Sequence, residues 1–166
     1  MHESVRARLA TVREIERVHG PRCVPYLLDV LDDQYEPAPV RIHVLRRLRN
    51  GRFLAEFRPA IAAAILPLLL EVRLTDLRLQ ALLSLADFTD IDTVLLSLGR
   101  VALDAGEPID IRYIAFTSLQ RAGPTAECVG FLRQLATDEA LGDSAQSVLS
   151  LWGQTPRRPD GLEHRT

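Results

Sequence analysis

Aspartate and arginine recur in this chain as close pairs, and pairs of this kind can do chemistry. Asp76 stands two positions before Arg78, and Asp110 stands two positions before Arg112. A carboxylate beside a guanidinium can serve as part of an acid–base centre, or it can form an ion pair that only stabilises the fold. The surrounding sequence has to decide between these two interpretations.

No other motif indicates a catalytic or metal site. The acidic segment 87–92 lacks the central glycine and the closing glutamate of a calcium loop, so helix capping is its expected role. None of the four histidines stands at ligand spacing to a cysteine, an aspartate or another histidine: His2, His19, His43 and His164. The sequence also lacks a glycine-rich phosphate loop and a nucleophile elbow. We therefore expect no metal, no cofactor and no enzymatic activity.

One stretch has a strong charge contrast. Between Arg41 and Arg58 the chain holds six arginines against Glu56 alone, a net charge of +5, whereas the whole chain carries −2. This stretch is either a solvated face that keeps the protein soluble, or a docking patch for an acidic peptide or a phosphate.

The residues above belong to a repeat that must position them. The phrases Pro39-Val40-Arg41, Asp76-Leu77-Arg78 and Asp110-Ile111-Arg112 place their arginines 37 and 34 positions apart. Apolar residues follow each phrase at helical offsets, and an eroded fourth copy starts at Asp143-Ser144. This period, with two helical patterns in each repeat, predicts an all-α fold of stacked helix pairs.

Proline, glycine and apolar periodicity set the expected boundaries of the elements. One leading helix and four antiparallel pairs are expected, at 3–18, 22–33, 39–49, 59–72, 75–88, 91–104, 109–121, 124–137 and 140–152. Pro25 and Pro67 occupy equivalent places and are expected to kink their helices. We expect residues 1–152 to form one domain and residues 153–166 to form a disordered tail.

The repeat resembles the HEAT family of armadillo-like α-solenoids over residues 21–152. The Leu-Pro-like runs at Val24-Pro25 and Leu66-Pro67 resemble the first helix of a HEAT repeat, and the Asp76 and Asp110 phrases resemble its second helix. The resemblance implies a right-handed α–α superhelix. It also implies a structural ladder between neighbouring repeats, made of Arg41, Asp76, Arg78, Asp110, Arg112 and Asp143.

Cys23 and Cys128 occupy the same place in two repeats that are three units apart. Because helices pack about 8–10 Å apart, these cysteines lie too far from each other for a disulfide. We expect two free, buried thiols.

The composition and the ends of the chain limit which other classes of function are expected. All twenty basic residues are arginine, which is typical of a GC-rich bacterial genome, and the near-neutral net charge argues against a nucleic-acid footprint over the whole molecule. The longest apolar run, 60–70, is shorter than the roughly 20 residues that cross a bilayer. A charged N-terminus replaces the apolar core of a signal peptide. We expect a cytoplasmic protein with no membrane partner.

In the HEAT family the second helices line the concave face, which implies a ladder of solvent-side residues. This predicted binding face comprises His43, Arg46, Arg47, Gln80, Leu83, Ser84, Ile114, Thr117, Ser118, Gln146, Leu149 and Ser150. Apolar residues rimmed by polar ones are typical of a protein-interaction surface. The main hypothesis is a non-enzymatic scaffold or adaptor that binds a protein or peptide. The alternatives are a nucleic-acid binder using the Arg41–Arg58 patch and an accessory subunit of an enzyme.

Overall fold

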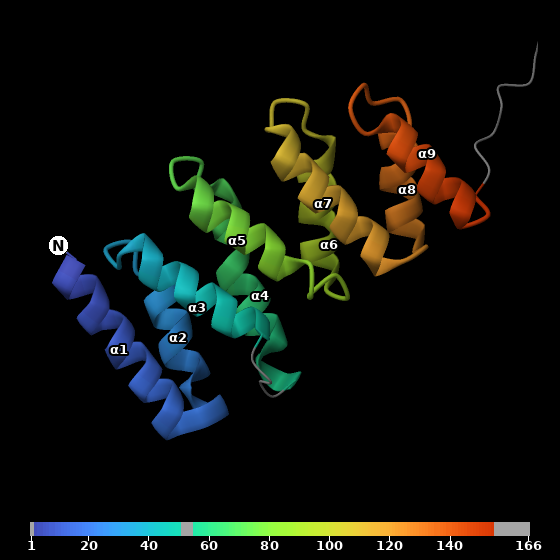
Figure 1. Cartoon of the computed structure of the whole chain (residues 1–166). Coiled ribbons are helices and arrows are strands. Elements are labelled where there is room, and N and C mark those ends of the chain that lie inside the picture. The colour runs from blue at the N-terminus through green and yellow to red at the C-terminus, as the bar shows by residue number, and fades with distance from the viewer. Residues whose placement is uncertain (1, 51–54, 155–166) are drawn as a thin grey trace, which may run out of the picture. The chain divides into compact units, whose positions relative to one another are not determined.

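The computed structural model describes residues 2–50 and 55–154, and each regular element in these two ranges is a helix (Figure 1). The first half comprises α1 (His2–His19), η1 (Gly20–Cys23), α2 (Val24–Asp32), α3 (Ala38–Asn50), η2 (Ala55–Phe57), α4 (Arg58–Ile65), η3 (Leu66–Leu70) and α5 (Thr75–Leu85). The second half comprises α6 (Asp92–Leu103), α7 (Ile109–Ala122), α8 (Ala126–Leu135) and α9 (Gly142–Leu151). The predicted all-α class is confirmed for these residues. None of the helices described is long and apolar enough to cross a membrane.

The chain divides into two compact units, Met1–Leu98 and Gly99–Thr166, with the boundary inside α6. In unit 1, α2 and α3 form one antiparallel hairpin, and α4 with η3 forms another with α5 (Figure 1). The second helices α3 and α5 lie side by side, α2 packs against α4, and α1 packs on α3. In unit 2, α8 packs against both α7 and α9.

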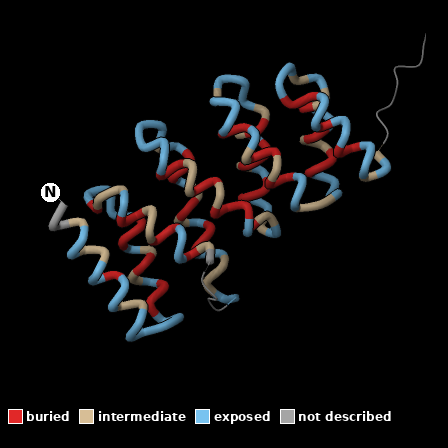
Figure 2. Tube along the Cα trace, in the orientation of Figure 1, coloured by how far each residue is buried: buried red, intermediate tan, exposed pale blue. Residues whose placement is uncertain are grey.

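Each hairpin buries the apolar side chains that recur at three- and four-residue steps along its helices (Figure 2). In α5, for example, Leu77, Ala81, Leu82 and Leu85 are fully buried. Leucine and alanine suit this role because both favour helix and lose little conformational freedom there.

A buried arginine joins the two helices of each of the first three hairpins. The Nε atoms of Arg41, Arg78 and Arg112 donate to the carbonyls of Leu31 (2.9 Å), Leu69 (2.6 Å) and Ala102 (3.0 Å). Each carbonyl lies in the last turn of the preceding helix, where backbone carbonyls lack intrahelical partners. A cation is also favourable at that end of the helix dipole. We call these side chains the hairpin caps, because each one caps the first helix of its own hairpin.

The predicted ladder is only partly present. Arg112 Nη2 also contacts Asp138 Oδ2 at 2.5 Å, and Asp138 belongs to the next hairpin along the chain. The three aspartates of the predicted ladder are instead exposed in the first turns of α5, α7 and α9: Asp76, Asp110 and Asp143. A carboxylate in the first turn stabilises the positive end of the helix dipole. These aspartates therefore favour helix initiation at their sites.

The fourth hairpin has a glutamine in place of the arginine. Gln146 Nε2 donates to the Ala136 carbonyl at 2.8 Å, ten residues upstream, which is the separation found for Arg41 and Arg112. Gln146 also stands 34 positions after Arg112, as Arg112 does after Arg78. The structural equivalent of Arg112 is therefore Gln146, two positions beyond the Ser144 that the sequence pattern suggests.

Two expectations about helix ends are wrong in detail. Pro25 lies in the first turn of α2, where it costs nothing, and Pro67 lies where α4 gives way to the 3₁₀ helix η3. Gly153, with φ of 69°, ends α9, because its N–H and that of Gln154 donate to the carbonyls of Ser150 and Leu149. Residues 153 and 154 are thus ordered, and the remainder of the predicted tail, 155–166, lies outside the described residues.

Candidate functional site

The predicted binding face is not a continuous row of accessible side chains. Ser84 and Ser118 are buried, and their hydroxyls donate to the carbonyls of Gln80 (2.7 Å) and Ile114 (2.8 Å), one turn earlier in their own helices. A serine that is satisfied by its own helix offers nothing to a partner. These two residues are corrected from contact residues to packing residues.

Leu149 is also wrongly placed in the predicted face. Its exposed fraction is 1%. With Gln146 aligned to Arg112, Leu149 takes the position of Ala115 and belongs to the core. Leu151, which is 79% exposed, takes the surface position instead. The sequence pattern misses this because the fourth copy lacks the arginine that fixes its register.

Part of the predicted face does remain accessible. Arg46 on α3 is exposed, and its Nε donates to Gln80 Oε1 on α5 at 3.3 Å. Leu83, Ile114 and Thr117 are half-buried, and the Thr117 hydroxyl bonds to the Ile114 carbonyl at 2.9 Å. Ser150 is exposed at the end of α9. These residues can be touched by a partner, although none of them forms a cleft by itself.

The arginine-rich stretch is largely neutralised by carboxylates from other elements. The pairs are Arg47–Glu16 (3.1 Å), Arg49–Asp87 (3.5 Å) and Arg58–Asp90 (2.5 Å). Arg41 is buried as a hairpin cap, and Arg52 lies outside the described residues. Arg58 also lies over the ring of Phe88, with 4.8 Å from its Cζ to the ring centroid. Three of the six arginines are therefore paired with carboxylates, which weakens the argument for a phosphate-binding patch.

A buried polar junction joins α1 to α3. His43 Nε2 lies 3.9 Å from Glu16 Oε1, too far for a hydrogen bond, and neither atom has a hydrogen-bond partner among the described residues. Burial lowers the pKa of His43. Glu16 opposes this shift, and Arg13, Arg47 and Arg46 add to it. His43 is therefore a neutral imidazole near pH 7, part of the packing rather than a charged contact.

The two cysteines behave as the sequence predicts. Cys23 and Cys128 are free and buried, and burial raises the pKa of each thiol. A protonated thiol is a poor nucleophile. Among the described residues, no three side chains of the ligand-forming types come together in a way that could hold a metal ion.

The most unusual surface lies at the hairpin turns of unit 1. Tyr35 is 93% exposed in the turn between α2 and α3, while Leu70 and Val72 are 82% and 69% exposed between η3 and α5. Leu74, at the entry to α5, is also exposed. We call Tyr35, Leu70, Val72 and Leu74 the turn surface. Both turns lead into α3 and α5, which run side by side in the same direction, so the turns lie at the same end of that pair (Figure 1).

Sequence reasoning misses the turn surface because it leaves Tyr35 and Leu74 between predicted helices and assigns Leu70 and Val72 to a helix. The predicted helix 59–72 includes Leu70 and Val72, and a continuous apolar run inside a helix indicates burial. In the structure α4 ends at Ile65 and η3 at Leu70, so the last apolar residues project from a turn. The available signal is the alternation of apolar and charged residues over 70–74, which does not fit a helical period.

Comparison with known proteins gives no match, since no family model, curated protein or solved structure shows significant similarity to this chain. The proposals about its function therefore rest on its residues and their geometry.

Proposed function

We propose that this chain is a non-enzymatic protein-binding module, a small scaffold or adaptor built as a HEAT-like α-solenoid. The repeated hairpin supports the solenoid part of the proposal. Four hairpins share one internal register, in which a side chain of the second helix caps the end of the first. Stacked units of this kind present extended surfaces, and their common use is to bind other macromolecules.

The observation that carries the binding function is the turn surface. Turns are normally polar, and a group of large apolar side chains held in water is unfavourable unless something covers it. Four large apolar residues with exposed side chains lie on two adjacent turns of unit 1. A protein partner is the occupant that gains most from covering apolar side chains whose surrounding backbone groups already have their hydrogen bonds.

The geometry favours a protein over a nucleic acid. The arginines that would contact phosphate are paired with Glu16, Asp87 and Asp90. Phosphate contacts supply most of the affinity of a nucleic-acid binder, and guanidinium groups that are already paired gain little from them. Within unit 1, the accessible part of the second-helix face, with Arg46 and Leu83, is a secondary contact region of the same module.

Affinity capture from cells of the source organism, compared across variants, tests this function. The double variant Leu70→Ser/Val72→Ser removes apolar contacts from the turn surface, and the matched control Leu151→Ser removes an equally exposed leucine elsewhere. We expect both proteins to keep the wild-type melting temperature, because exposed substitutions change stability little. A partner that wild type and control retain and the double variant loses supports the proposal. An identical set of captured proteins for all three contradicts it.

A further inference from the structure

The turns that close the hairpins carry a marked charge asymmetry. The stretches 32–36, 71–76, 104–110 and 138–143 hold three, two, three and three acidic residues, which is half of the chain's 22. Arg73 is the only basic residue in these stretches. Each of these stretches is therefore net acidic, opposite in sign to the Arg41–Arg58 stretch.

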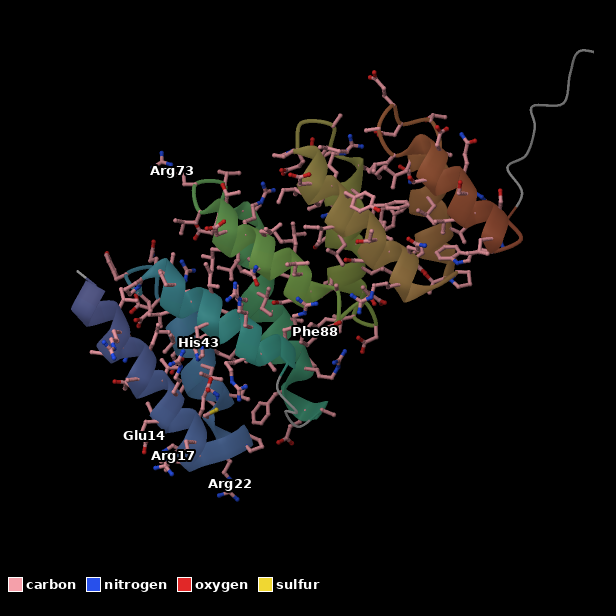
Figure 3. The ribbon with its side chains drawn as sticks, viewed as in Figure 1. Glu14, Arg17, Arg22, His43, Arg73 and Phe88 are labelled. Atoms are coloured by element: carbon pink, nitrogen blue, oxygen red, sulfur yellow. The ribbon has the colours of Figure 1, made fainter. Side chains whose placement is uncertain are left out.

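Within unit 1 the acidic side chains flank the turn surface and are not neutralised by ion pairs. Asp32, Asp33 and Asp76 are exposed and Glu71 is half-buried, and none of the four forms an ion pair with another described residue. The exception is Glu36, which is buried and receives two hydrogen bonds from Arg8 Nε, at 2.9 and 2.8 Å. Arg73 is exposed at the tip of the second turn and points away from the helices (Figure 3).

Two arginines at this end of the hairpins face inward, and Arg8 on α1 is paired with Glu36. Arg41 and Arg78 are buried at this end of the hairpins, where they cap Leu31 and Leu69. The dipoles of the two antiparallel helices in a hairpin oppose each other, so they add little net field at the turn. Among the described residues of the two turns, the charge that a partner meets in water comes from the four carboxylates and Arg73, because Glu36 is already paired with Arg8.

From this combination we infer the kind of partner: the turn surface of unit 1 binds a basic amphipathic segment, which carries large apolar residues on one face and Lys or Arg beside them. This inference rests on the proposed protein-binding function. Leu70 and Val72 supply the apolar contact, with Tyr35 on the neighbouring turn. Asp32, Asp33 and Asp76 lie beside them and attract the basic residues of the segment, which speeds encounter and excludes acidic partners.

The size of the surface fits a short segment. Neighbouring helices pack roughly 8–10 Å apart, so the two turns are separated by a distance that about two turns of a helix would span. A segment of that length can place apolar residues on Tyr35 and Leu70 at once. It can then project its basic side chains toward the carboxylates on either side.

Fluorescence anisotropy with three labelled peptides tests the inference on the full chain. The probes are a short amphipathic peptide of leucine and lysine, its leucine–glutamate counterpart, and a serine–lysine peptide that keeps the charge and lacks the apolar face. We expect the leucine–lysine peptide to bind at least roughly tenfold more tightly than either of the others. Tight binding of serine–lysine alone would indicate a purely electrostatic contact and overturn the inference.

Matched variants locate the binding site. Leu70→Ser/Val72→Ser should weaken the leucine–lysine peptide by roughly tenfold, and Asp33→Asn/Asp76→Asn by several-fold at low salt, with less effect as salt rises. The controls Leu151→Ser and Glu139→Gln/Asp143→Asn change exposed residues of unit 2 and should stay within about twofold of wild type.

The possible failures are distinguishable. Equal binding of the leucine–glutamate peptide, or equal loss in the unit 2 control, overturns the basic-segment inference and leaves the binding function intact. The same conclusion follows if Leu70→Ser/Val72→Ser loses a cellular partner but wild type binds none of the peptides. If the cellular partners bind this variant as well as they bind wild type, the proposed function itself is overturned.

Discussion

The arginines of this chain fall into two regions with opposite uses. Arg41, Arg78 and Arg112 are buried, and each caps a helix within its own hairpin. The arginines of the 46–58 stretch are more exposed, and most of them pair with carboxylates from distant elements. The arginines of the first group are regularly spaced along the chain and hold the fold together. Those of the second group stand close together in the sequence, but in the structure most of their charge is balanced by carboxylates. A run of like charges in a sequence is therefore weak evidence for a charged surface.

The largest expected effect comes from removing a hairpin cap. Arg112→Ala leaves the Ala102 carbonyl and the Asp138 carboxylate without their guanidinium partner, although Asp138 keeps its bonds from the N–H groups of Ala140 and Leu141. We expect a loss of about 1–3 kcal/mol in the free energy of unfolding, measured by urea denaturation. A change near zero would show that the buried arginines do not differ from the exposed ones.

The fourth hairpin provides a milder version of the same test. Gln146→Ala removes a neutral donor from the Ala136 carbonyl, and the amide is exposed. The expected loss is about 0.5–1 kcal/mol by the same measurement, which is smaller than for Arg112 because no charge is involved. Gln146→Arg should recover this loss, and a further loss in that variant would argue against the register of the fourth hairpin.

The adjacent residues Arg46 and Arg47 allow a paired surface charge to be compared with an unpaired one, because only Arg47 contacts the carboxylate of a described residue. Arg47→Glu places a second carboxylate beside Glu16, which is mostly buried, whereas Arg46→Glu changes only a contact with a neutral amide. We expect Arg47→Glu to lower stability by up to about 1 kcal/mol and Arg46→Glu to have almost no effect. Thermal unfolding of the two single variants decides the question. Equal behaviour would mean that Glu16 does not hold Arg47.

The smallest effect is a pH dependence at the α1–α3 junction. Burial lowers the pKa of folded His43 below its ordinary value of 6.5, so the unfolded chain binds the proton more readily. Stability then rises with pH in this window, and it falls as the pH drops through 6.5 toward the lower folded pKa. His43→Gln should flatten that decline, while His19→Gln, at an exposed site, should not. Unfolding curves between about pH 5.5 and 7.5, one unit on each side of 6.5, measure the difference.

Much of the fold can be predicted from the sequence because its signals are local. Gly20, Pro108 and Gly123 mark ends that the structure confirms within a few residues, since these residues restrict the backbone wherever they occur. The burial of Arg41, Arg78 and Arg112 follows from their repeated phrase. The predicted exposure of Leu149 is wrong because the fourth copy has a glutamine in place of the arginine that sets the register.

The surface is harder to predict because it depends on contacts between residues that are far apart in the chain. Glu16 and Arg47 are 31 positions apart, and Arg58 and Asp90 are 32 apart, so no short pattern reveals that they cancel. The turn surface depends on whether α4 continues past Pro67, which tertiary packing decides.

The hairpin caps have a consequence for how such a chain can grow. Donor and acceptor lie about ten residues apart, inside one hairpin, and the hairpins recur every 34 positions in the second half of the described chain. A tandem duplication of one such segment in the gene copies both partners together, so the new hairpin arrives with its internal bond already complete. The number of hairpins can then change by whole units without a matching mutation elsewhere. Only the first and last hairpins have to acquire a polar outer face.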